Sequence, residues 1–148
     1  MKRTLKIKRL RAEAVLPLQA TEGSAGMDLC ACLNEPVTIR PGELKMIPTG
    51  LAVEPEGEDC ALFLFARSGL GVKHGICLSN GVGVVDRDYR GEVCVGLCNV
   101  SDTPYTIQPG ERVAQMILMP VFCAQIVQAE TLSETRRGAG GFGSSGKL

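Results

Sequence analysis

Residues 78–91 read Leu-Ser-Asn-Gly-Val-Gly-Val-Val-Asp-Arg-Asp-Tyr-Arg-Gly, and the alternating run Val-Cys-Val-Gly-Leu follows at residues 93–97. The apolar segment 82–85 and the run 93–97 flank a polar turn, which is the pattern of a β-hairpin. We therefore expect two paired strands, with the functional groups carried by the turn that joins them.

The turn combines three kinds of recognition group. It contains Asp86 and Tyr89, and Asn80 stands shortly before it. Glycines on both sides allow the backbone to approach a ligand closely. A carboxylate, an amide and an aromatic ring in such a setting predict a pocket for a small polar ring compound. A hairpin with only a polar tip is the competing interpretation of this stretch taken alone.

The composition of the chain favours one mostly β domain. Its 148 residues are enough for a single hydrophobic core. Glycine provides 18 of them, aromatic content is low and no long helical period is present, which predicts a turn-rich β protein. Sixteen basic and sixteen acidic residues cancel. This balance argues against a general nucleic-acid binder or anionic-membrane binder.

The seven cysteines predict free thiols rather than a disulfide framework. Their number is odd, and most lie inside apolar or alternating segments. Neither Cys30-x-Cys32 nor Cys94-x-x-x-Cys98 has the usual spacing of a zinc knuckle, and His74 is the only imidazole. We expect no zinc site. Free thiols, no signal-peptide pattern at the start and no apolar stretch of about 18 residues predict a soluble cytoplasmic protein without a membrane partner.

The rest of the pattern predicts a scaffold of short strands. The expected strands are residues 5–10, 36–39, 43–48, 51–55, 60–65 and 105–107. The run 60–65 is continuously apolar, which is typical of a strand buried on both faces. On a strand beginning at residue 112, Arg112, Ala114 and Met116 would share one face, and Val113, Gln115 and Ile117 the other.

Five segments together resemble the five motifs of the trimeric deoxyuridine triphosphate nucleotidohydrolases (dUTPases), in that family's order and spacing. They are spread over nearly the whole chain from residue 20 to 146. The third motif is Asn80-x-x-Gly83-x-Val85-Asp86-x-x-Tyr89-x-Gly91. The first, second, fourth and fifth are residues 23–31, 66–70, 109–118 and 136–146. Two positions depart from the family pattern, with Met27 in place of an aromatic residue and Ala66 in place of proline.

The resemblance implies an architecture and an assembly. The fold would be all-β and jelly-roll-like (β-clip), with one β domain at residues 1–135 and a flexible glycine-rich arm at 136–148. Three chains would assemble as a homotrimer with active sites at the subunit interfaces. No nucleic-acid partner is implied.

The resemblance also implies an activity, the hydrolysis of dUTP to dUMP and pyrophosphate. This reaction limits uracil in DNA and supplies dUMP for thymidylate synthesis. Asp86 would activate the water that attacks the α-phosphorus. Mg²⁺ would be held mainly by the three phosphates, with Asp28 contributing through water. The implied substrate-binding residues are Arg67, Ser68, Gly69, Asn80, Gly83, Val84, Val85, Tyr89, Gln115, Arg137, Phe142, Gly143 and Ser144.

Physical chemistry fits several of these roles. A guanidinium, a hydroxyl and the backbone N–H groups of a helix start, at residues 67–69, can converge on an anion. Asp28 on a strand points away from Met27 and Leu29, toward a polar site, although it could instead cap backbone donors. Gln115 needs a hydrogen-bond partner, either phosphate or a group inside an interface.

Other interpretations remain open or fail on context. Residues 138–143 match a dinucleotide-binding glycine pattern and 141–147 nearly match a P-loop, but neither follows a strand. Plain disorder is the alternative for this glycine-rich tail. A dCTP deaminase of the same fold would carry a glutamate where Cys94–Leu97 stand, and a regulator that has lost catalysis would still bind nucleotide. We interpret His74 as a loop histidine rather than a base.

Overall fold

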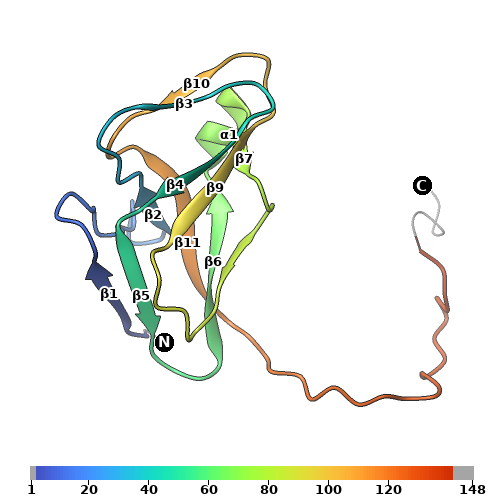
Figure 1. Cartoon of the computed structure of the whole chain (residues 1–148). Coiled ribbons are helices and arrows are strands. Elements are labelled where there is room, and N and C mark those ends of the chain that lie inside the picture. The colour runs from blue at the N-terminus through green and yellow to red at the C-terminus, as the bar shows by residue number, and fades with distance from the viewer. Residues whose placement is uncertain (1–2, 142–148) are drawn as a thin grey trace.

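A computed structural model describes residues 3–141 and shows a nearly all-β chain with one short helix (Figure 1). The expected all-β, jelly-roll-like class is confirmed. The elements in chain order are β1 (Leu5–Arg9), β2 (Met27–Cys30), β3 (Val37–Ile39), β4 (Leu44–Pro48), β5 (Leu51–Pro55), β6 (Cys60–Ala66), α1 (Ser68–His74), β7 (Ile76–Leu78), β8 (Gly83–Val85), β9 (Cys94–Asn99), β10 (Tyr105–Ile107) and β11 (Arg112–Pro120). The scaffold strands agree with the sequence prediction to within one or two residues.

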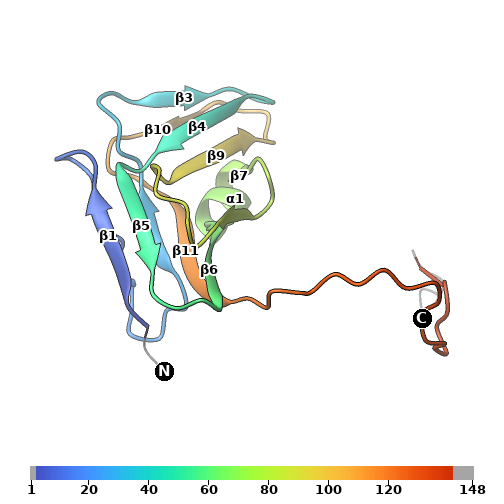
Figure 2. The same ribbon diagram turned by 60° about the horizontal axis from the view of Figure 1, so that its bottom comes forward.

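The strands are arranged in antiparallel sheets around one core. A four-stranded sheet has the order β2-β11-β6-β8, and a three-stranded sheet has the order β4-β9-β7. Two further pairs, β1–β5 and β10–β3, complete the fold. Figure 2 shows β3, β4, β9 and β10 on one side of the molecule, with β1, β5, β6 and β11 on the other.

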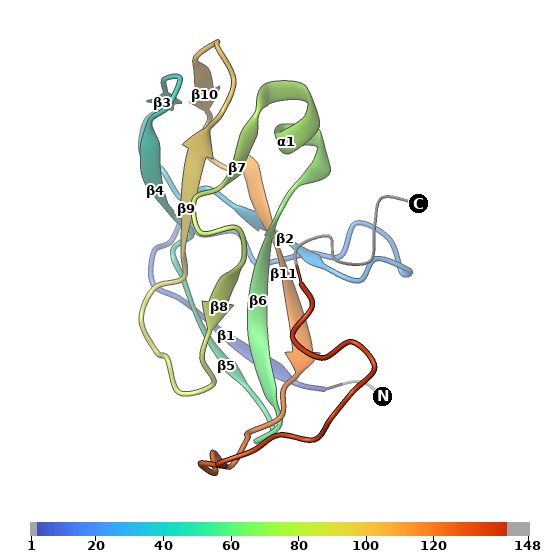
Figure 3. The same ribbon diagram turned by 90° about the vertical axis from the view of Figure 1, so that its right-hand side faces the viewer.

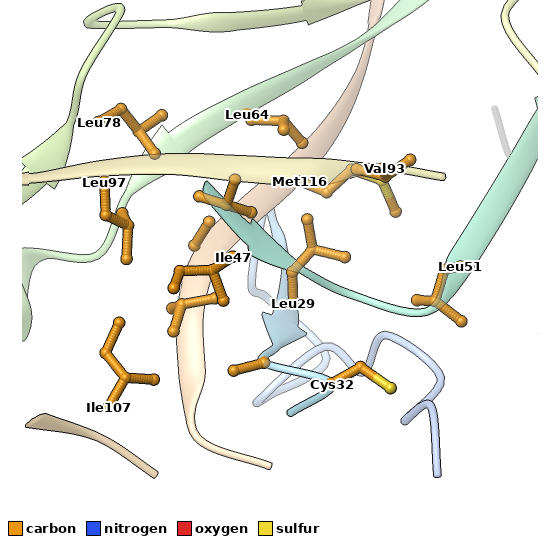
Figure 4. Close-up of a cluster of buried hydrophobic side chains, with 14 of the residues drawn as sticks. Leu29, Cys32, Ile47, Leu51, Leu64, Leu78, Val93, Leu97, Ile107 and Met116 are labelled. Carbon is orange, nitrogen blue, oxygen red and sulfur yellow. The ribbon is translucent and has the colours of Figure 1, made fainter. Parts of the chain in front are cut away.

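Branched and unbranched aliphatic side chains from both larger sheets fill the core. Leu29, Ile47, Leu62, Leu97 and Met116 are at most 1% exposed, and Figure 4 shows most of this cluster. Burying one such side chain contributes about 1.5–3 kcal/mol to folding. The core therefore fixes the two sheets against each other, and so fixes the loops that cross between them.

The two strands around the Asp86 turn both exist, but the predicted hairpin is wrong. β8 pairs with β6, whereas β9 pairs with β4 and β7 (Figure 3). The intervening residues 86–93 therefore cross from one sheet to the other. They form a longer connection than the loops of roughly two to five residues that close most hairpins. Each strand instead pairs where it buries its own apolar residues, such as Val85 opposite Leu62 and Leu97 in the other sheet.

The prediction that residues 60–65 are buried on both faces is also wrong for the single chain. Leu62 and Leu64 are buried on β6, but Phe63 and Phe65 are only partly buried. These phenylalanines point to the outer face of the four-stranded sheet. The continuous apolar run therefore predicted more burial of the outer face of β6 than a single chain provides.

After β11 ends at Pro120, residues 121–141 contain neither helix nor strand and extend away from the sheets (Figures 1 and 2). Phe122, Ile126 and Leu132 in this segment are almost fully exposed. Phe142, Gly143 and Ser144 of the expected arm lie outside the described residues.

All seven cysteines are free, as predicted. The Sγ atoms of Cys77 and Cys98 lie 3.2 Å apart at facing positions of β7 and β9. Over the described part of the chain, no helix has both the length and the apolar character needed to cross a bilayer.

Candidate functional site

A cavity of about 350 Å³ lies where β8 and β9 diverge, and it gathers most of the third motif. Its lining includes the predicted residues Asn80, Gly83, Val84, Val85, Asp86 and Tyr89, together with Glu92 and residues 93–96. The connection between the two sheets therefore forms the pocket that we expected at a hairpin turn. It places a carboxylate, an amide and an aromatic ring around one space.

β8 supplies an open backbone edge to this cavity. It is the last strand of its sheet, so only one of its edges pairs with β6. Every second backbone N–H and C=O along the other edge is then free to bind a ligand. Gly83 permits this packing, since a Cβ there would lie 3.0 Å from Cβ of Leu64.

Hydrogen bonds within the loop fix Asp86 and Tyr89 relative to each other. The Tyr89 N–H donates to the Asp86 carbonyl at 3.1 Å, which closes a turn. The Tyr89 hydroxyl donates to the carbonyl of Glu92 at 3.0 Å. The ring lies directly over Gly91, where an added Cβ would come within 2.6 Å of Tyr89 Cζ. Only glycine at position 91 leaves room for this ring.

A second group of predicted residues lies around Asp28 on β2. The Arg67 Nε donates to Asp28 Oδ1 at 3.1 Å, and an Arg112 guanidinium nitrogen donates to Oδ2 at 2.9 Å. Arg67 also donates to the Arg112 carbonyl at 3.0 Å. Asp28 does point away from Met27 and Leu29, but it holds two arginine side chains rather than capping the backbone. Both carboxylate oxygens are engaged, so Asp28 orients the guanidinium groups of Arg67 and Arg112.

Gln115 shares the outer face of the sheet with Asp28. The two residues are directly opposite each other across β11 and β2, and Phe65 faces Gln115 from β6. Gly26 makes room for the amide, since a Cβ there would lie 3.0 Å from Gln115 Oε1. Ala114 and Met116 are buried on the opposite face, as alternation predicted. Val113 is buried as well, because the register shifts between Arg112 and Ala114.

The second motif begins the helix, as expected. Ser68 and Gly69 are exposed at the first positions of α1, and Leu70 anchors the helix in the core. His74, the last residue of α1, packs against Tyr105 with ring centroids 4.7 Å apart and the ring planes tilted by 43°. It is therefore a packing residue at a helix end, not the loop residue that we expected.

Within residues 3–141, the two groups remain apart in a single chain. Arg67, Ser68 and Gln115 do not line the cavity beside Asp86, and no hydrogen bond joins them to its lining residues. Arg137 is exposed, and its Nε donates to the Gly140 carbonyl at 2.8 Å.

Sequence reasoning missed two residues. Arg112 belongs with Asp28 and Arg67, and its place at the start of an alternating strand was the available signal. Glu92 borders the main cavity but carries no local signature, since its contacts come from residues about 42 and 81 positions away.

Burial and local charge shift the acidity of three groups near these sites. Burial raises the pKa of the Cys94 thiol, and burial together with the Asp28 carboxylate raises the pKa of Cys30. Burial and the hydrogen bond to Glu111 raise the pKa of Tyr105 to about 12. All three groups are held in their neutral forms at neutral pH.

Comparison with known proteins identifies the family. Residues 12–146 match the sequence model of the dUTPase family. The deoxyuridine 5'-triphosphate nucleotidohydrolase of Coxiella burnetii is 51% identical over 140 residues, covering 95% of this chain and 92% of the relative. Its counterpart from Paraburkholderia xenovorans is 46% identical over 147 residues, covering 99% of both chains.

Solved structures agree. The dUTPase of Staphylococcus bacteriophage 80alpha with dUpNHpp superimposes with a TM-score of 0.87 at 28% identity, covering 97% of this chain and 98% of that one. A mutant dUTPase of phage phi11, described with a structural Mg(II) ion, shares the fold with a TM-score of 0.79 at 22% identity. On its motifs, its sequence match over nearly the whole length and its fold, the chain belongs to the dUTPase family.

Proposed function

We propose that this protein hydrolyses dUTP to dUMP and pyrophosphate. The observation that carries the proposal is the cavity between β8 and β9, where Asp86 and Tyr89 flank an open strand edge. The names of the relatives and the dUTP analogue bound by the phage enzyme support the same substrate.

The chemical step needs a base and a positively charged environment for the phosphates. Asp86 accepts a proton from a water molecule, whose oxygen attacks the α-phosphorus while pyrophosphate leaves. Asp86 is exposed at the cavity, so water can reach it. Arg67, Ser68, Gln115 and Arg137 bind the phosphate oxygens and stabilise the developing charge.

The donor set fits a metal ion that arrives with its substrate. Among residues 3–141 no three His, Cys, Asp or Glu side chains are grouped as a cation site. Mg²⁺ prefers few protein carboxylates together with phosphate oxygens and water, so the substrate phosphates would hold it and Asp28 would act through water. The ion would neutralise phosphate charge.

Selectivity for uracil and deoxyribose comes from shape and hydrogen bonding. The Asn80 amide and the backbone of Val84 and Val85 on the open edge of β8 read the base. Tyr89 packs under the sugar and leaves no room for a 2′-hydroxyl. A wrong donor or acceptor would leave buried polar groups unpaired, which discriminates strongly.

A homotrimer explains why the two groups of site residues lie apart in one chain. The outer face of the four-stranded sheet carries a row formed by Val84, Phe63 and Ile117 in register, beside the row Phe65, Gln115 and Asp28. Exposed apolar surface of this kind marks an interface. A neighbouring copy packed here brings Arg67, Ser68 and Gln115 to the Asp86 cavity of another chain.

The glycine-rich arm completes the site. Residues 136–148 form an arm separate from the β domain at 1–135, and this arm closes over bound nucleotide. Phe142 stacks on the base, Arg137 meets the terminal phosphate, and Gly143 and Ser144 offer N–H and hydroxyl donors. Closure excludes water other than the attacking molecule. In a cytoplasmic setting the reaction limits uracil in DNA and supplies dUMP for thymidylate synthesis.

The test is pyrophosphate release from dUTP, dCTP, dTTP and UTP with Mg²⁺, by the full chain and by a chain truncated before Arg136. Release from dUTP alone, lost on truncation while the oligomer persists, is the expected result. Ammonia release from dCTP would replace the proposal with a deaminase. Binding of dUTP by the full chain without turnover would replace it with a regulator.

A further inference from the structure

Glu92 borders the cavity, and both oxygens of its carboxylate are bound to other parts of the chain. Oε1 accepts the Gly50 N–H at 2.7 Å, and Oε2 accepts an Arg11 guanidinium N–H at 3.3 Å. The side chain is 23% exposed. With both oxygens engaged, Glu92 is not arranged as a second base. Its contribution must come through the groups to which it is bound.

The partner of this carboxylate is a rigid turn between β4 and β5. Gly50 has φ +70°, and a Cβ there would lie 2.7 Å from Ala14 Cβ and 2.8 Å from Cys32 Sγ. Arg11 in turn donates to the Cys32 carbonyl at 3.2 Å. The Gly50 N–H thus points from a closely packed turn, and a carboxylate bound to it is fixed to the core.

The residue next to Glu92 reinforces the attachment. The buried Thr49 hydroxyl donates to the Val93 carbonyl at 2.6 Å, and the Val93 N–H donates to the Leu51 carbonyl at 2.8 Å. Residues 92 and 93 are therefore fastened to the β4–β5 turn through both backbone and side chain.

The backbone carbonyl of Glu92 makes a separate contact, with Tyr89. Its carbonyl accepts the Tyr89 hydroxyl at 3.0 Å, with the ring over Gly91. One residue thus links the rigid turn, through its carboxylate, to the Tyr89 ring, through its carbonyl. Tyr89 is 46% exposed, so packing alone does not hold its ring in place.

We propose that Glu92 is a positioning residue, which fixes the Tyr89 ring and thereby sets the discrimination between deoxyribose and ribose nucleotides. The inference rests on the proposed role of Tyr89 in dUTP hydrolysis. The Glu92 carboxylate is hydrogen-bonded to Gly50 and Arg11 and not to Asp86, so loss of the carboxylate affects nucleotide fit more than the proton transfer.

The experiment measures kcat and KM for dUTP and UTP with the full chain. Glu92→Ala is expected to raise KM for dUTP about tenfold, the size of a lost charge-assisted hydrogen bond, with kcat changed far less. The preference for dUTP over UTP falls by a similar factor. Glu92→Gln keeps an oxygen for the Gly50 N–H and is expected to retain most of that preference.

Glu43→Ala is the matched control. Glu43 also accepts a backbone N–H, from Arg40 at 2.9 Å, and pairs with a cation, Lys45, but it lies outside the cavity. Its loss is expected to leave KM and the dUTP preference unchanged. An equal effect of both substitutions would reduce Glu92 to a general stabilising residue and overturn the proposal.

A double-mutant cycle with Tyr89→Phe tests whether Glu92 acts through Tyr89. The Phe variant lacks the hydroxyl that Glu92 receives, so adding Glu92→Ala to it is expected to cost much less than in the parent chain. Full additivity would overturn the proposal. If Glu92→Ala is not folded at the assay temperature, Glu92→Asp, which keeps the charge but shortens its reach, replaces it with the same expected result.

The outcomes separate the two hypotheses. If Tyr89 variants keep the full preference for dUTP, the proposed role of Tyr89 fails and the positioning role fails with it. If Tyr89 variants lose the preference but Glu92 variants keep it, only the role of Glu92 is wrong.

Discussion

Asp86 and Tyr89 are the two ends of one hydrogen-bonded turn, yet they are expected to control different quantities. Asp86 lines the cavity and is exposed to water, whereas the nearby Asp88 borders a different surface, with Glu54 and Arg90. This difference in surroundings allows one carboxylate to be tested against its neighbour.

Asp86→Asn is expected to lower kcat by about 10²–10⁴, the usual contribution of a general base, because the amide cannot accept the water proton. Binding of a non-hydrolysable dUTP analogue should persist, as measured by calorimetry. Asp88→Asn is the control and should retain kcat. Substantial turnover by Asp86→Asn would exclude this residue as the base.

Tyr89→Ala is expected to relax the rejection of UTP. Removing the ring opens space under the sugar, so kcat/KM for UTP relative to dUTP should rise at least about tenfold. The comparison of the two substrates under saturating Mg²⁺ measures this ratio. An unchanged ratio would mean that another group excludes the 2′-hydroxyl.

At the scale of elements, Tyr105 joins three parts of the fold. It lies on β10, packs against His74 of α1 and donates a hydrogen bond from its hydroxyl to Glu111 before β11, at 2.5 Å. Glu111 also accepts the Gln108 N–H at 2.9 Å. This network holds the last residue of α1, the helix that begins with Ser68 of the second motif.

The raised pKa of Tyr105, about 12, predicts a dependence of stability on pH. The unfolded chain loses this proton near its ordinary pKa of 10.0, but the folded chain keeps it until about 12. Between those values the folded state binds more protons than the unfolded state. The contribution of Tyr105 to the free energy of unfolding is therefore full below pH 10 and is lost as pH rises toward 12. The free energy of unfolding, measured in urea, should therefore fall more steeply with pH over this range for the wild type than for Tyr105→Phe. Parallel curves for the two proteins would contradict the prediction.

At the scale of the whole molecule, the outer face of the four-stranded sheet carries apolar side chains that a single chain does not fully bury. Phe63, Phe65 and Ile117 lie there only partly buried, and the exposed Phe122 and Ile126 follow on the extended segment. These apolar side chains are where a neighbouring copy would gain most from contact.

Phe65→Glu is expected to dissociate the proposed trimer, because it would bury an unpaired carboxylate in the proposed interface. Sedimentation should then report the 15.7 kDa chain, and dUTP turnover should fall with the loss of shared sites. Val100→Glu is the control, since Val100 is 73% exposed after β9 and away from this face. A trimer that survives Phe65→Glu would place the interface elsewhere.

The sequence alone predicted most of the strands, although not β7, and the start of α1. Alternation and turn residues are local signals, which is why β5 and β10 match their predicted bounds and Asp28 faces away from Met27 and Leu29. The order and spacing of the five motifs likewise indicated the family, because both are properties of the linear chain.

The tertiary structure decided which strands pair and which distant groups meet. The chain around Asp86 looks locally like a hairpin, but β8 and β9 pair in different sheets, where Val85 and Leu97 are buried. The Asp28–Arg67–Arg112 cluster and the Glu92–Gly50 contact join residues far apart in sequence. Such contacts depend on the packing of the whole core, which no local pattern encodes.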